Sequence, residues 1–268
     1  AGGMAVLGSI QPQPVETQPD GTLRLADIAA AIKPDDPHFA RTRLVVLENT
    51  TGGQVLPPAY IAEVAQLARS RGLAMHLDGA RMFNAATANA ARNGTDVYDE
   101  ARALCSHFDS ASLCLSKGLG APVGSLVLGS RDFIRQARRT RKILGGGMRQ
   151  AGVLAAAGHY ALQHHVRRLA EDHARLDRLA QGLAEANRSH PALQGKITVL
   201  PWQTNILFTD LHAEVAPAFT AWLAQHGVRV TSSLYGGATR LRWVTHLDVS
   251  EADVTTALDC VARFQLPG

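Results

Sequence analysis

The chain has 268 residues, of which 46% are hydrophobic and 19% charged, enough to bury a large core in one or two domains. Its formal net charge is +4, and the basic residues are neither gathered into one tract nor interleaved with aromatic residues, which argues against a nucleic-acid-binding protein. No stretch has the length and hydrophobicity of a membrane span. The three cysteines form no C-x-x-C pair, so we expect a soluble cytoplasmic protein with reduced thiols.

The first half of the chain alternates between helical and strand patterns. The spacing of its apolar residues predicts helices over 25–32 and 60–71 and strands over 44–47, 73–77, 108–115 and 125–128. Such alternation favours an α/β fold with a mostly parallel sheet covered by helices. Ligands bind beyond the carboxyl ends of the strands in these sheets. The polar loop that begins at Glu48, together with Asp78 and Lys117, is therefore expected to line one edge.

The second half of the chain has a different pattern. It predicts a basic helix over 131–144, three glycines, and a long helical region over 148–187 with a break near 164–165. Beyond this region the pattern is typical of a small α+β domain, with strands over 197–200, 205–208, 228–231 and 239–244 and helices over 214–226 and 251–264. We therefore expect a large domain over residues 1–165 and a small domain over residues 166–268.

Two side chains at strand ends indicate cofactor chemistry. Lys117 precedes Gly-Leu-Gly, which leaves its amine accessible, although a lysine after a strand is usually a solvated charge. Asp78 is either the N-cap of the following helix or a functional carboxylate. A lysine that bonds to an aldehyde and an acid that keeps a pyridine nitrogen protonated are the two groups that pyridoxal phosphate needs. Such a lysine must lose its proton near neutral pH, which burial and a nearby cation favour.

Further basic residues are candidates for binding anions. Arg81 lies about one helical turn beyond Asp78, within reach of the cofactor or of a substrate carboxylate. The glycines at 145–147 are either a plain helix connection or a source of free N–H groups at a helix N-terminus, where Lys142 and Arg149 would add phosphate contacts. Arg240 and Arg242 share one face of a strand, so one of them is expected to reach the site.

The histidines do not predict a metal site. His76 and Asp78 share a strand face, but no third ligand can be identified. His164, His165 and His173 fall in a charged helical region, where we expect them on a solvated face.

Several segments together resemble one enzyme family, the low-specificity L-threonine aldolases: 6–14, 76–85, 115–125, 145–152 and 242–249. The resemblance covers almost the whole chain. It implies a fold-type I pyridoxal phosphate enzyme that cleaves L-threonine, L-allo-threonine or related β-hydroxy-α-amino acids to glycine and an aldehyde. It also implies a homotetramer, a dimer of dimers, in which Arg149 and Lys142 serve the phosphate side of a neighbouring subunit's site.

The same resemblance gives roles to single residues. It implies that Lys117 bonds to the cofactor, that Asp78 holds the pyridine nitrogen, and that Arg81 contacts both the cofactor and the substrate carboxylate. Arg242 is implied to be the principal carboxylate clamp. Thr51 stands where the family usually has a histidine that handles the substrate hydroxyl, which leaves the proton acceptor open and allows a preference for bulkier, phenylserine-like substrates.

The family pattern also includes a leading segment that this sequence lacks, with a phosphate cradle and a histidine that stacks on the cofactor ring. We therefore expect weak cofactor binding and little activity from this chain alone. The alternatives are another fold-type I reaction, such as transamination or racemisation, and an inactive oligomerising remnant that binds no cofactor.

Overall fold

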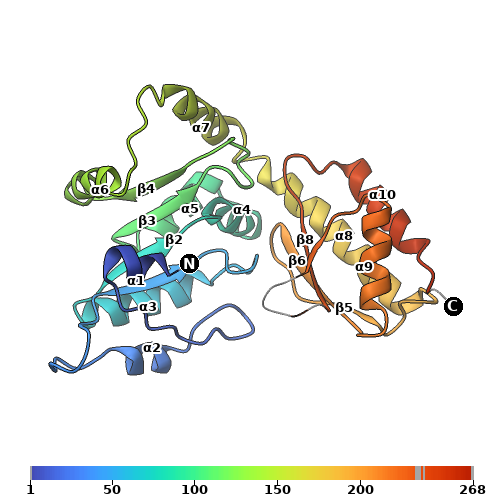
Figure 1. Cartoon of the computed structure of the whole chain (residues 1–268), viewed down its shortest axis with the longest axis horizontal. Coiled ribbons are helices and arrows are strands. Elements are labelled where there is room, and N and C mark those ends of the chain that lie inside the picture. The colour runs from blue at the N-terminus through green and yellow to red at the C-terminus, as the bar shows by residue number, and fades with distance from the viewer. Residues whose placement is uncertain (1, 233–236, 238, 267–268) are drawn as a thin grey trace.

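The computed structural model describes residues 2–232, 237 and 239–266, and it has two units, each built on a four-stranded sheet (Figure 1). The first unit contains α1 (Gly3–Gly8), α2 (Leu25–Ala31), β1 (Leu44–Glu48), α3 (Pro58–Ser70), β2 (Ala74–Asp78), α4 (Met82–Asn93), α5 (Val97–Cys105), β3 (Ser110–Cys114), β4 (Ser125–Gly129), α6 (Arg131–Ile143) and α7 (Gly152–His164). The second unit contains α8 (Leu169–Ser189), β5 (Ile197–Val199), β6 (Ile206–Leu211), α9 (Ala216–Gln225), β7 (Thr231–Ser232), β8 (Arg240–Val244) and α10 (Glu251–Ala262).

Most of the predicted elements are confirmed, including the helical break, which falls between α7 and α8. One prediction is wrong: residues 228–230 are not a strand, and β7 begins only at Thr231. The Val228 N–H donates instead to the Leu223 carbonyl (2.9 Å) and so closes the end of α9. Helix α5 was not predicted, although its N-cap Asp96 is a strong start signal, with a carboxylate that accepts from the Tyr98 N–H at 2.8 Å.

The first sheet brings three strand ends together. Its order is β1-β2-β3-β4, in which β1, β2 and β3 are parallel and β4 pairs antiparallel with β3, so the predicted mostly parallel sheet is confirmed. The register places Glu48 beside Asp78 and Asp78 beside Ser112. Because side chains at paired positions point to the same face, these three lie together at the carboxyl ends of their strands.

The opposite face of this sheet forms the core of the first unit. Leu47, Leu77 and Leu113 are buried on it and belong to one apolar cluster with residues of α3, α4 and α5. In α3 the buried residues fall at 61, 64, 65 and 68, the spacing of one helical face. The face that carries Glu48 and Asp78 is more open, as the exposure of Leu44 and Val46 on β1 indicates.

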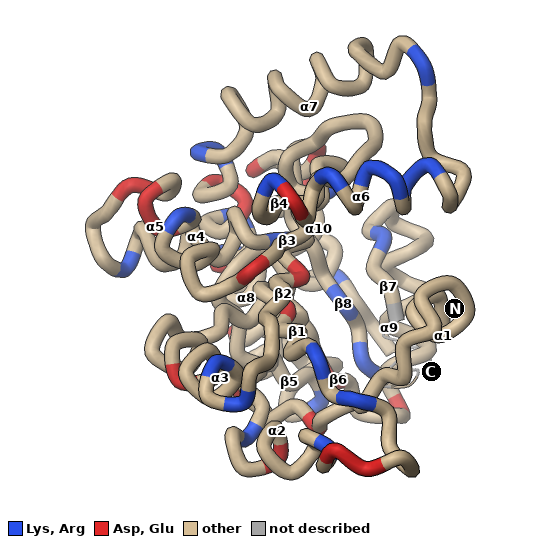
Figure 2. Tube along the Cα trace, turned by 90° about the vertical axis from the view of Figure 1, so that its left-hand side faces the viewer, with Lys and Arg blue, Asp and Glu red and all other residues tan. Residues whose placement is uncertain are grey.

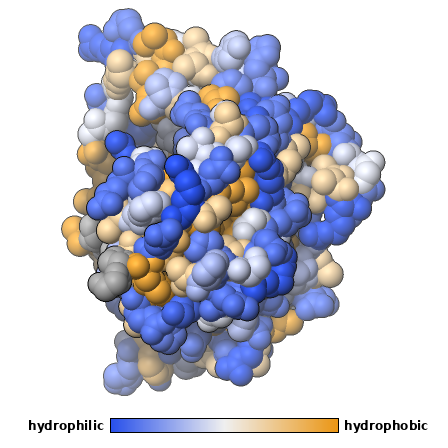
Figure 3. Space-filling view, turned by 90° about the vertical axis from the view of Figure 1, so that its right-hand side faces the viewer, coloured by the Kyte–Doolittle hydropathy of each residue, from blue (hydrophilic) through white to orange (hydrophobic). Residues whose placement is uncertain are grey.

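The outer edge of the first unit is exposed. Strand β4 is exposed along its whole length although Leu126, Val127 and Leu128 are apolar, and α6 buries no residue. Basic residues line α6 (Figure 2). Among the described residues, the large apolar side chains that are exposed all precede residue 165 except Leu247 and Leu266. The outer face of the second unit is accordingly mostly hydrophilic (Figure 3).

The second sheet is antiparallel, with the order β5-β6-β8-β7. Leu207, Leu241 and Trp243 point to one face and are buried with apolar residues of α8, α9 and α10. On the other face Phe208 pairs with Arg242, and this face is turned toward the first unit (Figure 1). The second sheet therefore presents its polar face to the carboxyl ends of the first.

Helix α8 takes part in both apolar clusters. Leu169, in its first turn, belongs to the cluster of the first unit, and Leu176, two turns later, belongs to that of the second. The division of the chain into domains at residues 165 and 166 stays a prediction. In the part of the chain that the structure describes, no helix combines the length and the apolar character needed to cross a membrane.

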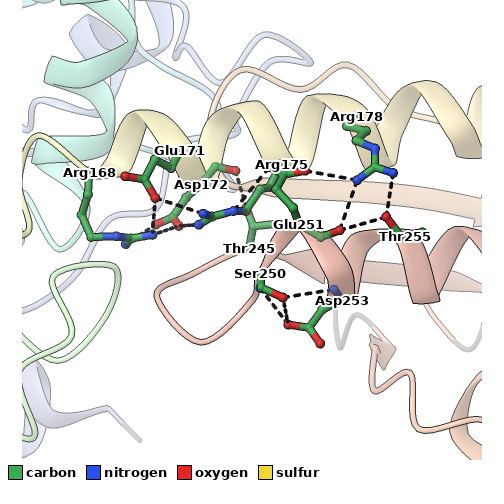
Figure 4. Close-up of polar contacts among 10 residues, drawn as sticks. All are labelled: Arg168, Glu171, Asp172, Arg175, Arg178, Thr245, Ser250, Glu251, Asp253 and Thr255. Atoms are coloured by element: carbon green, nitrogen blue, oxygen red, sulfur yellow. Dashed lines mark hydrogen bonds and ion pairs between the residues drawn. The ribbon is translucent and has the colours of Figure 1, made fainter.

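A buried aspartate, Asp172, organises the start of α8 through its carboxylate and ties the helix to the end of β8 through its backbone carbonyl. Asp172 is fully buried, and its oxygens accept hydrogen bonds from Arg168 at 2.6 and 3.1 Å, while Arg175 lies 3.6 Å away (Figure 4). The Asp172 carbonyl accepts from Thr245 Oγ1 at 2.6 Å. From the same helix, Arg175 and Arg178 form ion pairs with Glu251 in the first turn of α10. These contacts fix the loop after β8 to the helix.

We expect Asp172→Asn to destabilise the protein strongly. The substitution would leave Arg168 and Arg175, whose side chains are 13% and 16% exposed, without their buried counter-charge. Loss of one partner of a buried ion pair costs about 3 kcal/mol or more in the free energy of unfolding. Asp99→Asn is the matched control, because Asp99 pairs with Arg102 on the surface and its loss should not be measurable. Equal denaturation midpoints for the two variants would contradict the role of Asp172.

Candidate active site

Lys117 lies on a tight turn just beyond β3. The turn is closed by the Gly120 N–H, which donates to the Lys117 carbonyl at 2.8 Å. Gly120 has φ +70°, and a Cβ there would lie 2.8 Å from Leu247 Cδ2, so this position requires glycine. Gly118 and Leu119 are buried, whereas the Lys117 side chain is exposed at the rim of the sheet, where its amine is accessible.

Asp78 ends β2 with its carboxylate next to the start of α4. Its Oδ1 accepts a hydrogen bond from the Ala80 N–H at 3.1 Å, and its carbonyl accepts from the Asn49 N–H at 3.0 Å. Helix α4 begins at Met82 with Arg81 as its N-cap and has no side-chain cap. The N-cap alternative for Asp78 is therefore wrong.

Four charged side chains influence one another at this edge. Partial burial and, after it, the Asp78 carboxylate raise the pKa of Glu48, whereas Arg81 and Lys117 oppose this rise. Glu48, Asp78, Arg81 and Lys117 therefore form one electrostatic cluster. We predicted Glu48 only as the start of a polar loop. Its position as the last residue of a strand could have indicated that it belongs to this cluster. Its carboxyl group can hold a proton at a higher pH than an ordinary glutamate.

Arg240 and Arg242 share a face of β8 but have different surroundings. Arg240 forms a bidentate ion pair with Asp210, with N···O distances of 2.5 and 2.6 Å. Burial and, after it, the charge of Arg81 lower the pKa of Arg242. Over residues 2–232, 237 and 239–266, neither Arg81 nor Arg242 pairs with a carboxylate. Two neighbouring guanidinium groups without an acid partner form a site for an anion, so Arg242, not Arg240, is the arginine available here.

Thr51 begins a turn that follows the cluster residue Glu48. Its backbone pairs with Gln54, and its Oγ1 donates to the Glu48 carbonyl at 2.9 Å. The Thr51 hydroxyl proton is thus held by the backbone. Thr51 therefore lies beside the charged cluster, but its hydroxyl serves to shape the turn.

The tip of this turn contacts the second unit close to Arg242. The Gly53 carbonyl accepts from Thr204 Oγ1 at 2.7 Å. A Cβ on Gly52 would lie 3.5 Å from the ring of Phe208, which is the register partner of Arg242 on β6. The Thr51 turn and Arg242 are therefore brought to the same side of the second sheet.

Lys142 and Arg149 are not brought to this edge. Both are exposed: Lys142 lies in the last turn of α6, and Arg149 lies in the segment that joins α6 to α7, which runs along the outside of the first unit (Figures 1 and 2). Of the two alternatives for the glycine run, the structure favours the plain helix connection. The N–H groups of Gly145 and Gly146 donate to carbonyls at the end of α6, at 3.1 and 2.8 Å, and α7 begins only at Gly152. The glycines therefore end one helix and do not open the next.

Two of the three histidines near the helical break are not solvated as we expected. Nδ1 of His165 lies 2.6 Å from the Leu119 carbonyl, and Nε2 of His173 lies 3.0 Å from Oδ1 of Asn84. Only His164 is exposed. The many charged residues of this region led to the prediction of a solvated face, but the face that carries His165 and His173 packs against the first unit.

The comparisons with known proteins agree with this geometry. Residues 1–204 match the family model described as beta-eliminating lyase. Over 250 residues the chain is 48% identical to the low specificity L-threonine aldolase of Escherichia coli O157:H7, a match that spans 93% of this chain and 68% of that relative. It is 40% identical over 270 residues to a probable low-specificity L-threonine aldolase of Arabidopsis thaliana, covering 98% and 72%. The chain belongs to the low-specificity L-threonine aldolase family.

The structure of a threonine aldolase from Leishmania major has the same fold. It matches with a TM-score of 0.70 at 20% identity, covering 92% of this chain and 68% of that chain. The predicted fold-type I architecture and the family resemblance are thus confirmed. As a threonine aldolase family member, the protein is a lyase that depends on pyridoxal phosphate.

The residues at the sheet edge fit this cofactor. The accessible amine of Lys117 suits an aldehyde, and the Asp78 carboxylate suits a protonated pyridine nitrogen. The guanidinium of Arg242, which has no carboxylate partner in the described part of the chain, suits an anion. Beside them, the buried Nδ2 of Asn49 and Oγ1 of Thr50 have no hydrogen-bond partner in the described structure. Orphaned polar atoms next to an open sheet face indicate a place for a polar ligand.

Proposed function

We propose that this aldolase family member cleaves L-threonine, L-allo-threonine and related β-hydroxy-α-amino acids to glycine and an aldehyde. The observation that carries the proposal is the pair of guanidinium groups of Arg81 and Arg242. Arg81 follows Asp78 in sequence, Arg242 lies on the sheet face that meets the turn after Glu48, and neither has a carboxylate partner among the described residues. An α-amino acid presents one carboxylate, which such a pair binds in a fixed orientation. The names of the relatives support the same reaction.

Each residue has a defined part in this proposal. Pyridoxal phosphate, when bound, supplies the electron-withdrawing ring that stabilises negative charge on the substrate Cα. Lys117 holds it covalently through Nζ, and Asp78 keeps a proton on the ring nitrogen. Arg81 and Arg242 orient the substrate carboxylate, and this orientation selects the bond to Cβ for cleavage. Glu48 supplies a carboxyl group that can hold a proton within the same cluster.

We propose a broad substrate range because Thr51 is short. Its hydroxyl is occupied by the Glu48 carbonyl, so it adds no bulk and no free donor on the side of the substrate hydroxyl. Phenylserine-type substrates are therefore part of the proposal. Transamination is less favoured, because the relatives that are similar in sequence are named as aldolases.

We propose that the protein is a cytoplasmic homo-oligomer, a dimer of dimers with shared active sites. The exposed apolar residues of β4 and α6 support an interface on the first unit. Lys142 and Arg149 lie on this surface, apart from the Lys117 edge of their own subunit, which suits a role in a neighbouring site. The three free cysteines, Cys105, Cys114 and Cys260, suit a reducing compartment.

The test of the function is the covalent bond to Lys117. The purified protein is expected to show a visible absorption band with pyridoxal phosphate, to release glycine and an aldehyde from L-threonine, and to carry the borohydride-reduced label on the peptide with Lys117. Lys117→Ala should lose the label. A label on another lysine would contradict the assignment, and a protein without any band would be the inactive remnant.

The arginines of β8 allow a matched test of carboxylate binding. Arg242→Lys keeps the charge but loses the two-pronged contact, so KM for L-threonine should rise about tenfold, and further in Arg242→Ala. Arg240→Lys keeps the ion pair with Asp210 and should leave KM unchanged. Steady-state kinetics measure both values. An equal rise in the two lysine variants would argue against Arg242 as the specific clamp.

Shared active sites predict complementation between two inactive variants. Lys117→Ala removes the covalent attachment, and Arg149→Ala removes the proposed phosphate contact to the neighbour. When the two variants are unfolded, mixed and refolded together, mixed dimers contain one intact site, so about a quarter of the native activity should return. Each variant refolded alone is the control. If the mixture stays as inactive as its components, Arg149 acts within its own subunit or not at all.

A further inference from the structure

We propose that His165, after α7, and His173, in α8, are positioning residues that hold the Lys117 turn in place. The proposal rests on the proposed attachment of the cofactor to Lys117. His165 directly follows α7 and His173 lies in the second turn of α8. Among the described residues, their hydrogen-bond partners are Leu119 and Asn84, outside the charged cluster. Each hydrogen-bonds a group that lies directly against the turn from Lys117 to Gly120 (the lysine turn).

His165 holds the lysine turn through its backbone. Nδ1 lies 2.6 Å from the carbonyl oxygen of Leu119, which can only accept, so Nδ1 carries the proton. Leu119 is 3% exposed, which makes this carbonyl costly to leave without a donor. The ring also packs against the turn, since a Cβ on Gly120 would lie 3.5 Å from the same nitrogen.

His173 holds the lysine turn through Asn84 of α4. Its Nε2 lies 3.0 Å from Oδ1 of Asn84, so here Nε2 carries the proton. Burial lowers the pKa of His173 to about 4, which keeps the ring neutral at neutral pH. Asn84 is 3% exposed, and its Nδ2 would lie 3.5 Å from a Cβ on Gly118. Leu169, one turn before His173, would lie 2.9 Å from the same Cβ.

These contacts matter because the lysine itself is not held. The Lys117 side chain is exposed, so the place of its amine depends on the backbone of the turn, where Gly118 and Leu119 are buried. The same helix α8 is tied through Asp172 to Thr245, three residues beyond Arg242. The turn that carries the lysine and the strand that carries the substrate arginine are thus both fixed to one helix.

The two histidines differ in the nitrogen that they use, and this difference gives a matched experiment. The amide of asparagine can replace an Nδ1 donor and that of glutamine an Nε2 donor. His165→Asn and His173→Gln should therefore retain the bond, whereas His165→Gln and His173→Asn should lose it. Both pairs are compared in the holoenzyme with L-threonine as substrate.

The variants that lose the bond should show a kcat lowered about tenfold with little change in KM, since Arg242 still binds the carboxylate. They should also hold pyridoxal phosphate more weakly, measured from its visible absorbance during dialysis. The variants that retain the bond should match the native protein in both readouts. Asn should thus be tolerated at position 165 and Gln at position 173. Differences in side-chain packing alone would not produce this opposite preference.

The proposal is overturned if Asn and Gln behave alike at both positions, or if kcat falls only in step with the melting temperature across the four variants. If one position yields no folded protein, the pair at the other position decides by the same criterion. The failure of the proposed function looks different: the native protein would then carry no borohydride label on Lys117, and the positioning role would fall with it.

Discussion

The parallel pairing of β1, β2 and β3 is the constraint on which the whole site depends. It brings Glu48 next to Asp78 and places the turn with Lys117 beyond the third strand of the same edge. A slip of one residue would turn Glu48 and Asp78 toward the covered face of the sheet. The buried leucines at 47 and 77, which alternate with these acids, oppose such a slip, so the apolar core fixes the position of the charges.

The second unit completes the site with a different kind of sheet. Its antiparallel register pairs Arg240 with Asp210 and Arg242 with Phe208. A difference of two residues along one strand therefore decides which guanidinium is neutralised by a carboxylate. The backbone carbonyl of the buried Asp172 then fixes the end of that strand to α8, because it accepts a hydrogen bond from Thr245 Oγ1. Because α8 begins in the apolar cluster of the first unit and continues into that of the second, the apolar cores of both units include residues of the same helix.

The sequence was a good guide where function follows from local features. Lys117 and Asp78 could be found because each follows an apolar strand, and the mostly parallel sheet could be found from the alternation of helices and strands. The role predicted for Thr51, and the assignment of Lys142 and Arg149 to a neighbouring subunit's site, came from the family resemblance alone, because no local feature of the chain indicates them. The strand over 228–231 was misread because its apolar residues close a helix.

Contacts between residues far apart in the sequence could not be predicted. Asp210, which forms the ion pair with Arg240, lies 30 positions away in the sequence, and the hydrogen-bond partners of His165 and His173 lie 46 and 89 positions away. Periodicity within a helix carries no information about such contacts. The glycines at 145–147 failed for a related reason, because a glycine run looks the same whether it ends one helix or leads into the next.

The exposure of strand β4 has a consequence for the solubility of this protein. It is the last strand of the described sheet, it is exposed along its whole length, and its centre is the run Leu126, Val127 and Leu128. An apolar border strand with unused N–H and carbonyl groups is a template for adding further strands. A surface that covered this border would both bury its apolar run and pair its main-chain groups, so solubility and assembly would be coupled through this one strand.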